Sequence, residues 1–410
     1  MTPFPHRTPV IAALIVAALT LPTLATSEAV PEVLEDGSLW RTERVSKLVD
    51  REVFGGFKHL FVNEAGEVFH VDETYRPDGT GTSEHGAISV FKRDALGIWS
   101  VTDVFPFDGR ISFALPRAAA MTADGTIHIL VDYYTGSADP FALAYHVQLH
   151  PNGSIETNRF PTNPNEGVAG HMAIDPNGQV ALVWQHAAKT TYSTFDGQTW
   201  TSTLIVNGYL PNIIGLVYDS HDKPHLAAGN KLYTTNTAGA WIIEETYSPN
   251  FILGGDIAIA SDDTLHLVRQ EWEQKPILLR TRHPNGTWTN TYLPSTTQSD
   301  DLFIALDSHD NPHITYYSNP YGNGTGYRRY LHQHTNGQWQ DHAITLMSLS
   351  AHPFSDAAMT IGPDDRLHLT YTIYEDIDPG QPLANTANTL GYATMLRPQL
   401  NALEPPSPLL

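Results

Sequence analysis

The sequence predicts an all-β fold: a seven-bladed β-propeller of four-stranded antiparallel blades, in which an N-terminal strand completes the last blade and closes the ring. Three observations predict it. A short phrase, Asp307-Ser-His-Asp-Asn-Pro-His313, recurs along the chain with variations. A second motif, Gly-x-Trp or Gly-x-x-Trp, follows most of its copies. The last copy lacks that second motif, and a matching segment stands before the first copy.

The recurring phrase predicts a β-hairpin in each copy. It ends at an equivalent residue each time: His70, His128, Ala181, His225, His266, His313 and His368. The copies at His70 and Ala181 are the weakest, because the first has one extra residue and the second has Ala in place of His. Each copy runs from an apolar segment through Asp, Gly, Asn or Pro into β-rich residues, which is the order strand, tight turn, strand.

The Gly-Trp motif predicts a second hairpin in most units. It occurs at Gly97-Ile-Trp99, Gly197-Gln-Thr-Trp200, Gly239-Ala-Trp241, Gly286-Thr-Trp288 and Gly337-Gln-Trp339. Two hairpins make four strands, and units of four strands at a period of roughly 40 to 50 residues are typical of β-propellers.

The ends of the repeat region predict how the ring closes. The last unit reaches its third strand at 389–396 and then stops. The segment 36–45, which contains Trp40, resembles the fourth-strand segment 336–344. An N-terminal strand that completes the last blade leaves no open sheet edge at the seam, so residues 36–396 are expected to form one domain.

The N-terminus has the pattern of a signal peptide over residues 1–27. A short basic start precedes the apolar run 10–21, and small residues follow before Ser27. Pro22 ends the run after about a dozen residues, whereas a membrane anchor needs roughly 20. We therefore expect export, with no membrane insertion after signal cleavage.

The remaining composition predicts a bacterial secreted or periplasmic protein. The chain has no Cys, so its stability depends on packing without disulfides. Residues 28–35 and the Pro-rich tail 397–410 carry no repeat pattern and are expected to be irregular. The formal net charge of −21 excludes a nucleic-acid partner, because phosphate binding needs Lys and Arg stripes. We expect a monomer.

The order of strands predicts which face carries function. The tight turns of both motifs fall on one face of the ring, and they are uniform, as structural turns are. The links between strands two and three, and those between blades, fall on the other face. They are long and irregular here, and variable loops on a rigid scaffold are where binding residues usually lie.

Polar residues precede each expected innermost strand on the loop-rich face, and they should converge on the mouth of the central channel. They are His59, Arg117, His171, Asn212, Asp256, Asp301 and Asp356. The loops between strands two and three add others, among them Glu271 and Tyr317. Arg beside carboxylates, His and aromatic rings suits a glycan or another small polar ligand. The alternative is that these side chains hydrate the pore and pair with one another.

The repeated His predicts a structural role rather than a metal site. A residue that recurs in every blade does what every blade needs, whereas ligands of one ion must converge from different places. No metal-binding, phosphate-binding or nucleophile motif is present, so we expect no metal and no cofactor. Acidic clusters at Asp300-Asp301 and at 375–378 could hold calcium, but solvated loops are the better explanation.

The repeats resemble the sialidase-like, BNR-type propellers. Their Asp-box is Ser/Thr-x-Asp-x-Gly-x-Thr-Trp, and Ser193-Thr-Phe-Asp-Gly-Gln-Thr-Trp200 keeps its Ser, Gly, Thr and Trp. Sialidases have six blades, an arginine triad and a Tyr/Glu nucleophile pair. Seven-bladed polysaccharide lyases and lectins are nearer to this chain in blade number.

The function predicted is glycan binding at the loop-rich face of the central channel. Two alternatives remain open. One is a glycan-cleaving enzyme at the same place: in a lyase, His171 or Tyr317 would transfer the proton and Arg117 would neutralise a uronate, and in a hydrolase Asp256 and Glu271 would be the acid and base. The other is a protein-interaction scaffold.

Overall fold

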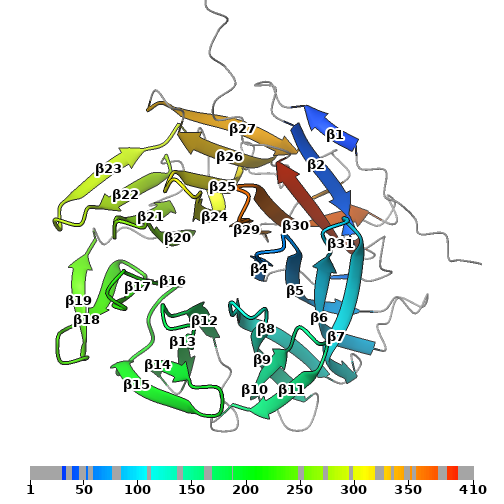
Figure 1. The fold of residues 1–410 in the computed structure, drawn as a ribbon, viewed down its shortest axis with the longest axis horizontal. Helices are drawn as coiled ribbons and strands as arrows, with labels where there is room; N and C mark the ends of the chain where they lie inside the picture. Colours follow the sequence, from blue (N-terminus) through cyan, green and yellow to red (C-terminus); the bar gives the residue numbers. More distant parts are fainter. Residues whose placement is uncertain are drawn as a thin grey trace, which may run out of the picture.

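A computed structural model describes most of the repeat region. The residues it describes are 30–33, 39–45, 52–53, 59–75, 85–108, 112–135, 142–160, 169–186, 188–247, 254–270, 276–294, 299–318, 327–333, 337–345, 351–352, 357–376 and 386–395. Seven antiparallel blades surround a central axis (Figure 1), so the fold predicted from the repeats is confirmed. The expected signal peptide at residues 1–27 and the tail 397–410 lie outside the described residues.

Each blade contains four strands in sequence order from the axis outward, except at the seam. The innermost strands are β4 (His59–Val62), β8 (Ser112–Met121), β12 (Ala169–Ile174), β16 (Ile213–Tyr218), β20 (Gly254–Ile259), β24 (Ser299–Leu306) and β29 (Ala357–Ile361). The second strands are β5 (Val68–Tyr75), β9 (Ile127–Thr135), β13 (Val180–His186), β17 (Pro224–Ala228), β21 (Leu265–Gln270), β25 (Pro312–Ser318) and β30 (Leu367–Asp376).

The outer half of each blade completes the sheets. The third strands are β6 (His85–Arg93), β10 (Ala142–Leu149), β14 (Lys189–Phe195), β18 (Lys231–Thr235), β22 (Leu278–Arg282), β26 (Tyr327–Gln333) and β31 (Thr386–Met395). The fourth strands, which are outermost in every blade except the last, are β7 (Trp99–Asp108), β11 (Ile155–Arg159), β15 (Trp200–Val206), β19 (Trp241–Thr246), β23 (Trp288–Tyr292), β27 (Trp339–Thr345) and the N-terminal β2 (Leu39–Arg44). Two short strands, β3 (Glu52–Val53) and β28 (Ala351–His352), pair with the second strands of the first and last blades.

The seam closes as the sequence predicts. β2 pairs antiparallel with β31, with Trp40 opposite Met395, so the N-terminus supplies the outer strand of the last blade. The expectation that residues 28–35 are irregular is wrong in part, because β1 (Val30–Val33) pairs with β2. Pro31 is compatible with this strand because β1 is an edge strand, where a missing N–H breaks no ladder.

The Trp of each Gly-Trp turn begins an outermost strand and packs between blades. Trp99 lies edge-on to Tyr392 of the last blade, with ring centroids 5.3 Å apart, and Trp40 contacts Tyr330 in the same way at 5.8 Å. Trp241 likewise contacts Tyr192 of the preceding blade. The hydrophobic core therefore consists of layers between neighbouring blades, and the repeated Trp packs into these layers.

The turn between strands one and two has the same backbone in every blade, and one of its residues is in the left-handed region. That residue is Gly66, Gly125, Gly178, Asp222, Asp263, Asp310 or Asp365 in successive blades. In the later blades the Asp also binds the preceding turn: Ser220 donates its N–H and its hydroxyl to Asp263 at 2.6 and 2.7 Å. Ser261 binds Asp310, and Ser308 binds Asp365, through the same pair of bonds.

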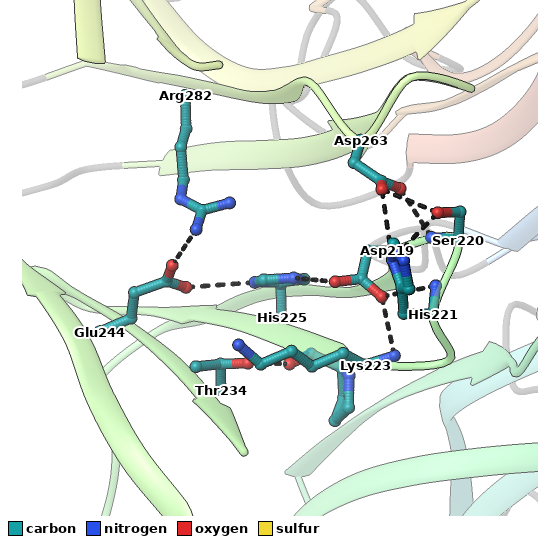
Figure 2. A network of polar contacts seen from close by, with 10 residues as sticks. Asp219, Ser220, His221, Lys223, His225, Thr234, Glu244, Asp263 and Arg282 are labelled. Atoms are coloured by element: carbon teal, nitrogen blue, oxygen red, sulfur yellow. Dashed lines mark hydrogen bonds and ion pairs between the residues drawn. The ribbon is translucent and has the colours of Figure 1, made fainter. Parts of the chain in front are cut away.

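The repeated His joins the turn to the outer part of its blade, as Figure 2 shows for His225. Its Nε2 lies 3.3 Å from Asp219 of the turn and its Nδ1 lies 3.2 Å from Glu244 in β19. Arg282 of the next blade contacts the same Glu244 at 2.5 Å. His313 contacts Asp307 of its own turn and Tyr330 of β26 in the same way. The repeated His therefore stabilises the blade at these two positions.

Within the described residues, no helix is long and apolar enough to cross a membrane.

Candidate functional site

A cavity of about 400 Å³ occupies the axis of the ring and is lined by residues from all seven innermost strands. The lining residues are His59, Phe61, Arg117, Ala119, Gly170, His171, Met172, Ile213, Ile214, Gly255, Asp256, Phe303 and Met359. His59, Arg117 and Asp256 lie farther from the turns between strands one and two than Phe61, Ala119 and Met359 do, and are therefore nearer the loop-rich face. The cavity is therefore polar towards its mouth and apolar further in.

Three of the predicted mouth residues fasten neighbouring blades together. His59 Nε2 donates to the carbonyl of Pro116 in the next blade at 3.0 Å. Asp256 accepts a 3.0 Å bond from the N–H of Ile304 in the next blade. Asp301 accepts a 2.9 Å bond from the N–H of Ala357. These contacts support the alternative reading of the ring at these positions, in which the polar side chains stabilise the pore.

Arg117 is placed differently from the other mouth residues. A β-bulge between Pro116 and Ala118 removes it from the regular ladder, and bulges often redirect a side chain near a functional site. Its Nε donates to Asp132 at 3.3 Å and its Nη2 to the hydroxyl of Tyr134 at 3.4 Å. Both partners lie on β9 of the same blade. The third nitrogen, Nη1, makes no hydrogen bond to a described residue.

His171 is the mouth residue with unused hydrogen-bonding capacity. Its Nδ1 is buried and has no partner among the described residues. Its Nε2 lies 3.7 Å from the position that a Cβ would take at Gly215, and Oδ1 of Asp256 lies 3.6 Å from the same position. Because residue 215 has no side chain, the imidazole of the third blade and the carboxylate of the fifth blade approach each other across the fourth.

Burial sets the protonation of the cavity histidines. It lowers the pKa of His171 to about 4. It also lowers the pKa of His59 to about 4, although the bond to the Pro116 carbonyl acts in the opposite direction. Both imidazoles are therefore neutral at pH 7, so each can accept or donate a hydrogen bond.

Glu73, in β5, is a titratable group behind Arg117. Burial raises its pKa to about 7, while the hydrogen bond from Tyr75 and the charge of Arg117 act in the opposite direction. The charge of Asp72 adds to the upward shift. Near neutral pH the carboxyl therefore exists in both protonation states.

The other predicted site residues lie away from the cavity or outside the described residues. Asp301 is buried, and its carboxylate forms an ion pair with Arg328 at 2.8 Å. Tyr317 is buried in β25, directly across from Arg328 in β26. Glu271 and Asp356 fall in segments outside the described residues. No cluster of three or more His, Asp or Glu side chains in the described part of the chain could hold a metal ion.

The sequence does not single out Asp132 and Tyr134, which bind Arg117, or Phe113, which stacks on Tyr134. Phe113 and Tyr134 are cross-strand partners, and their rings stack with centroids 4.4 Å apart. A signal was present: Asp132 and Tyr134 alternate along the second strand, so they lie on one face of the sheet. It could not be interpreted without knowing that the bulge at Arg117 turns that side chain towards the same face.

Comparison with known proteins relates this chain to others through its fold. No family model matches the sequence, and no curated protein matches it either. Among solved structures, virginiamycin B lyase from Staphylococcus aureus has a TM-score of 0.52 and 12% identity, covering 87% of this chain and 98% of its own.

Two further structures show the range of proteins that share the fold. An ulvan lyase, a polysaccharide lyase bound to a GlcA(1-4)Rha3S fragment, has a TM-score of 0.55 and 11% identity, covering 85% of this chain and 95% of its own. YCF48, bound to a D1 peptide, has a TM-score of 0.52 and 10% identity, covering 92% and 100%. These proteins are seven-bladed propellers, so the similarity shows the fold and leaves function to the site. A relationship to sialidase-like repeats stays a prediction.

Proposed function

We propose that this protein binds a glycan in the cavity at the mouth of its central channel. The observation that supports this most directly is the division of the cavity walls. Arg117, His171 and Asp256 offer donors and acceptors near the mouth, while Phe61, Ala119 and Met359 offer apolar surface further in. A sugar ring has the same division, with hydroxyl groups at its edge and C–H groups on its faces.

The charges at the mouth favour recognition of hydroxyl groups over recognition of a carboxylate. Arg117 is the one cationic side chain among the described lining residues, and it already faces the fully buried carboxylate of Asp132. Asp256 adds a second carboxylate to the cavity wall. Since His59 and His171 are neutral at pH 7, the described walls have no surplus of positive charge, and a neutral sugar fits them better than a uronate.

A glycan array followed by calorimetry tests the proposal. The purified protein should bind one class of neutral oligosaccharide, and His171→Ala should weaken that binding about tenfold, which corresponds to the loss of one hydrogen bond of about 1.4 kcal/mol. His221→Ala is the matched control, because His221 is a strongly exposed His on the opposite face. Absence of glycan binding, or equal affinity in the His171 variant, would refute the proposal.

The second candidate function is cleavage of a uronate-containing glycan by elimination at the same cavity. The observation that favours it is the neutral imidazole of His171 with its unbonded Nδ1, in a cavity that Arg117 also lines. His171 would take the proton from the carbon next to the carboxylate, and Arg117 would stabilise the resulting negative charge. The glycosidic C–O bond on the adjacent carbon would then break as the double bond forms, and the leaving oxygen would take a proton from water. Incubation with polygalacturonate and with ulvan should then produce unsaturated ends that absorb ultraviolet light, and His171→Ala should abolish them. Without such product, this candidate fails.

Export is part of the proposal. The predicted signal peptide would deliver a monomer to the bacterial periplasm or exterior, where glycans are available. Expression of the full chain in a bacterium, followed by fractionation, mass measurement and gel filtration, tests it. A mature mass consistent with cleavage near Ser27 is expected, and retention of the full-length chain in the cytoplasm would contradict it.

A further inference from the structure

Exposed apolar side chains are distributed unevenly over the described part of the ring. Most lie on outermost strands, on turns of the uniform face or in a link between blades: Leu96, Ile98, Ile155, Leu204, Tyr209, Ile242, Ile243 and Tyr292. Phe113 differs, because it is 44% exposed and lies on β8, an innermost strand. Single exposed apolar residues are ordinary on protein surfaces. One that stands at the loop-rich end of a channel-lining strand is in a position to meet a ligand.

The ring of Phe113 is held in place from behind. It stacks on Tyr134 with an interplanar angle of 12°, so one of its faces is covered and its exposed surface lies on the remaining side. The Tyr134 hydroxyl donates to Asp132 at 2.7 Å and accepts from Arg117 at 3.4 Å. These bonds fix the orientation of Tyr134 and therefore of the ring stacked on it.

The same contacts connect the aromatic pair to the cavity. Arg117 lines the cavity and also binds Tyr134, so the stacked pair lies next to the mouth on the side of the second blade. The Nη1 nitrogen of Arg117 makes no bond to a described residue, so it can donate to a ligand. A ligand that leaves the cavity on this side would pass a hydrogen-bond donor and then a fixed aromatic surface.

We propose that Phe113, supported by Tyr134, is a stacking subsite for a second sugar ring, so that the ligand is an oligosaccharide that extends from the cavity over the second blade. This inference rests on the proposed glycan binding and specifies its ligand. The apolar face of a pyranose packs on the ring of Phe113, and Arg117 donates to a hydroxyl group near the linkage between the two sugar units. A rigid aromatic surface binds with little loss of conformational entropy, because its own orientation is already fixed.

The length dependence of binding tests the subsite. Calorimetry compares glucose with cellotriose, and galacturonate with trigalacturonate. The wild-type protein should bind at least one trisaccharide about tenfold more tightly than its monosaccharide, as expected for one added aromatic contact. Phe113→Ala should remove this advantage and leave monosaccharide affinity unchanged. Tyr292→Ala, which removes a more exposed aromatic residue from an outermost strand, should leave both affinities unchanged.

Two further variants separate stacking from general apolar contact. Phe113→Trp should preserve the trisaccharide advantage, and Phe113→Leu should lose most of it although it keeps a large apolar side chain. Melting curves of all variants should coincide with that of the wild type. Equal trisaccharide affinity in the Ala or Leu variant overturns the subsite, and so does a wild-type protein that binds monosaccharides and trisaccharides equally. If the wild type binds none of the four sugars, the proposed function itself fails for these glycans.

Discussion

The two faces of the ring use equivalent positions of the blades in opposite ways. On the turn face, the same residue types make the same bonds from blade to blade, as Ser220 does with Asp263 and Ser308 with Asp365. At the channel mouth the equivalent positions carry different residues, and neither Arg117 nor His171 is hydrogen-bonded to a described residue of a neighbouring blade. Residues that recur at equivalent positions of the blades therefore stabilise the ring, and positions where the residue differs from blade to blade are candidates for ligand binding.

The largest effect is expected at the seam, where one strand completes a repeated pattern. Deletion of residues 30–46 removes β1 and β2, exposes the edge of β31 and removes Trp40, which is fully buried. Loss of Trp40 alone should cost about 3 to 5 kcal/mol of unfolding free energy. The deleted protein should aggregate or melt at a clearly lower temperature in calorimetry, and melting like the intact chain would contradict the closure.

Acidic pH is expected to lower the stability of the protein through buried histidines near both faces of the ring. Burial lowers the pKa of His128 and His368 to about 4 and that of His146 to about 3, and the cavity residues His59 and His171 also lie near 4. In the unfolded chain each titrates near about 6.5. Between these values the unfolded state binds more protons, so stability that is complete above pH 6.5 falls as the pH is lowered.

Melting temperature measured from pH 8 to pH 4 checks this expectation. A steep fall should begin below about pH 6.5, since the affected groups are buried neutral imidazoles. Replacement of His171 by Asn should remove its part of the fall and flatten the curve slightly. A melting temperature that does not change between pH 7 and pH 4.5 would show that these imidazoles do not have lowered pKa values.

A pair of His substitutions tests the comparison more directly. His313 is buried, with Nε2 3.4 Å from Asp307 and Nδ1 2.5 Å from the Tyr330 hydroxyl, so His313→Ala removes one buried hydrogen bond from each of these two side chains. The expected loss is about 1 to 3 kcal/mol of unfolding free energy. His171→Ala, by contrast, removes a ring whose Nδ1 is already unpaired and should cost less.

Denaturant unfolding of both variants gives the answer, with glycan binding measured in parallel. The turn-face variant should lose stability and keep affinity, while the mouth variant should keep most of its stability and lose affinity. The reverse result would show that repetition does not separate structural from binding residues in this protein.

The fold could be predicted because its information is repeated. The same local structure is predicted several times, by turn residues such as Asp219 and Asp307 and by the Trp residues of the second motif. A degenerate copy, such as the one at Ala181, is therefore recognised by its position in the series of repeats. β1 has no such repetition. It pairs with the outer side of β2, and among the described residues only the last blade has a strand at that position.

The site could be predicted only as a set of positions. Strand order brought His59, Arg117, His171 and Asp256 to one cavity, because residues of innermost strands at the same distance from the turn between strands one and two share a level of the ring. Their partners depend on details that strand order does not contain. A register shift removes Arg117 from its ladder, and another, between Asp300 and Phe303, accompanies the burial of Asp301.

The smallest expected effect concerns the hydrogen bonds between neighbouring turns. It tests whether these repeated bonds contribute independently to the free energy of unfolding. The bonds from the backbone and side chain of Ser220 lower the pKa of Asp263, so the contact favours the ionised carboxylate. Because the pair is exposed to solvent, the coupling between Ser220→Ala and Asp263→Gly should be only about 0.5 kcal/mol in a double-mutant cycle.

The pair can also be transferred to blades that lack it. Between the second and third blades the equivalent positions are Ala123 and Gly178, and a Cβ at Gly178 would meet nothing within 4 Å. Gly178→Asp alone should destabilise slightly, because its φ of 80° suits Gly better than Asp. Adding Ala123→Ser should recover about 0.5 kcal/mol of unfolding free energy through the new bond. The opposite outcome is that the effects of the two changes on the free energy of unfolding in urea are strictly additive, while the native pair is coupled. The bond would then depend on blade geometry that the turn sequence does not determine. The later blades would differ from the earlier ones in more than these two residues.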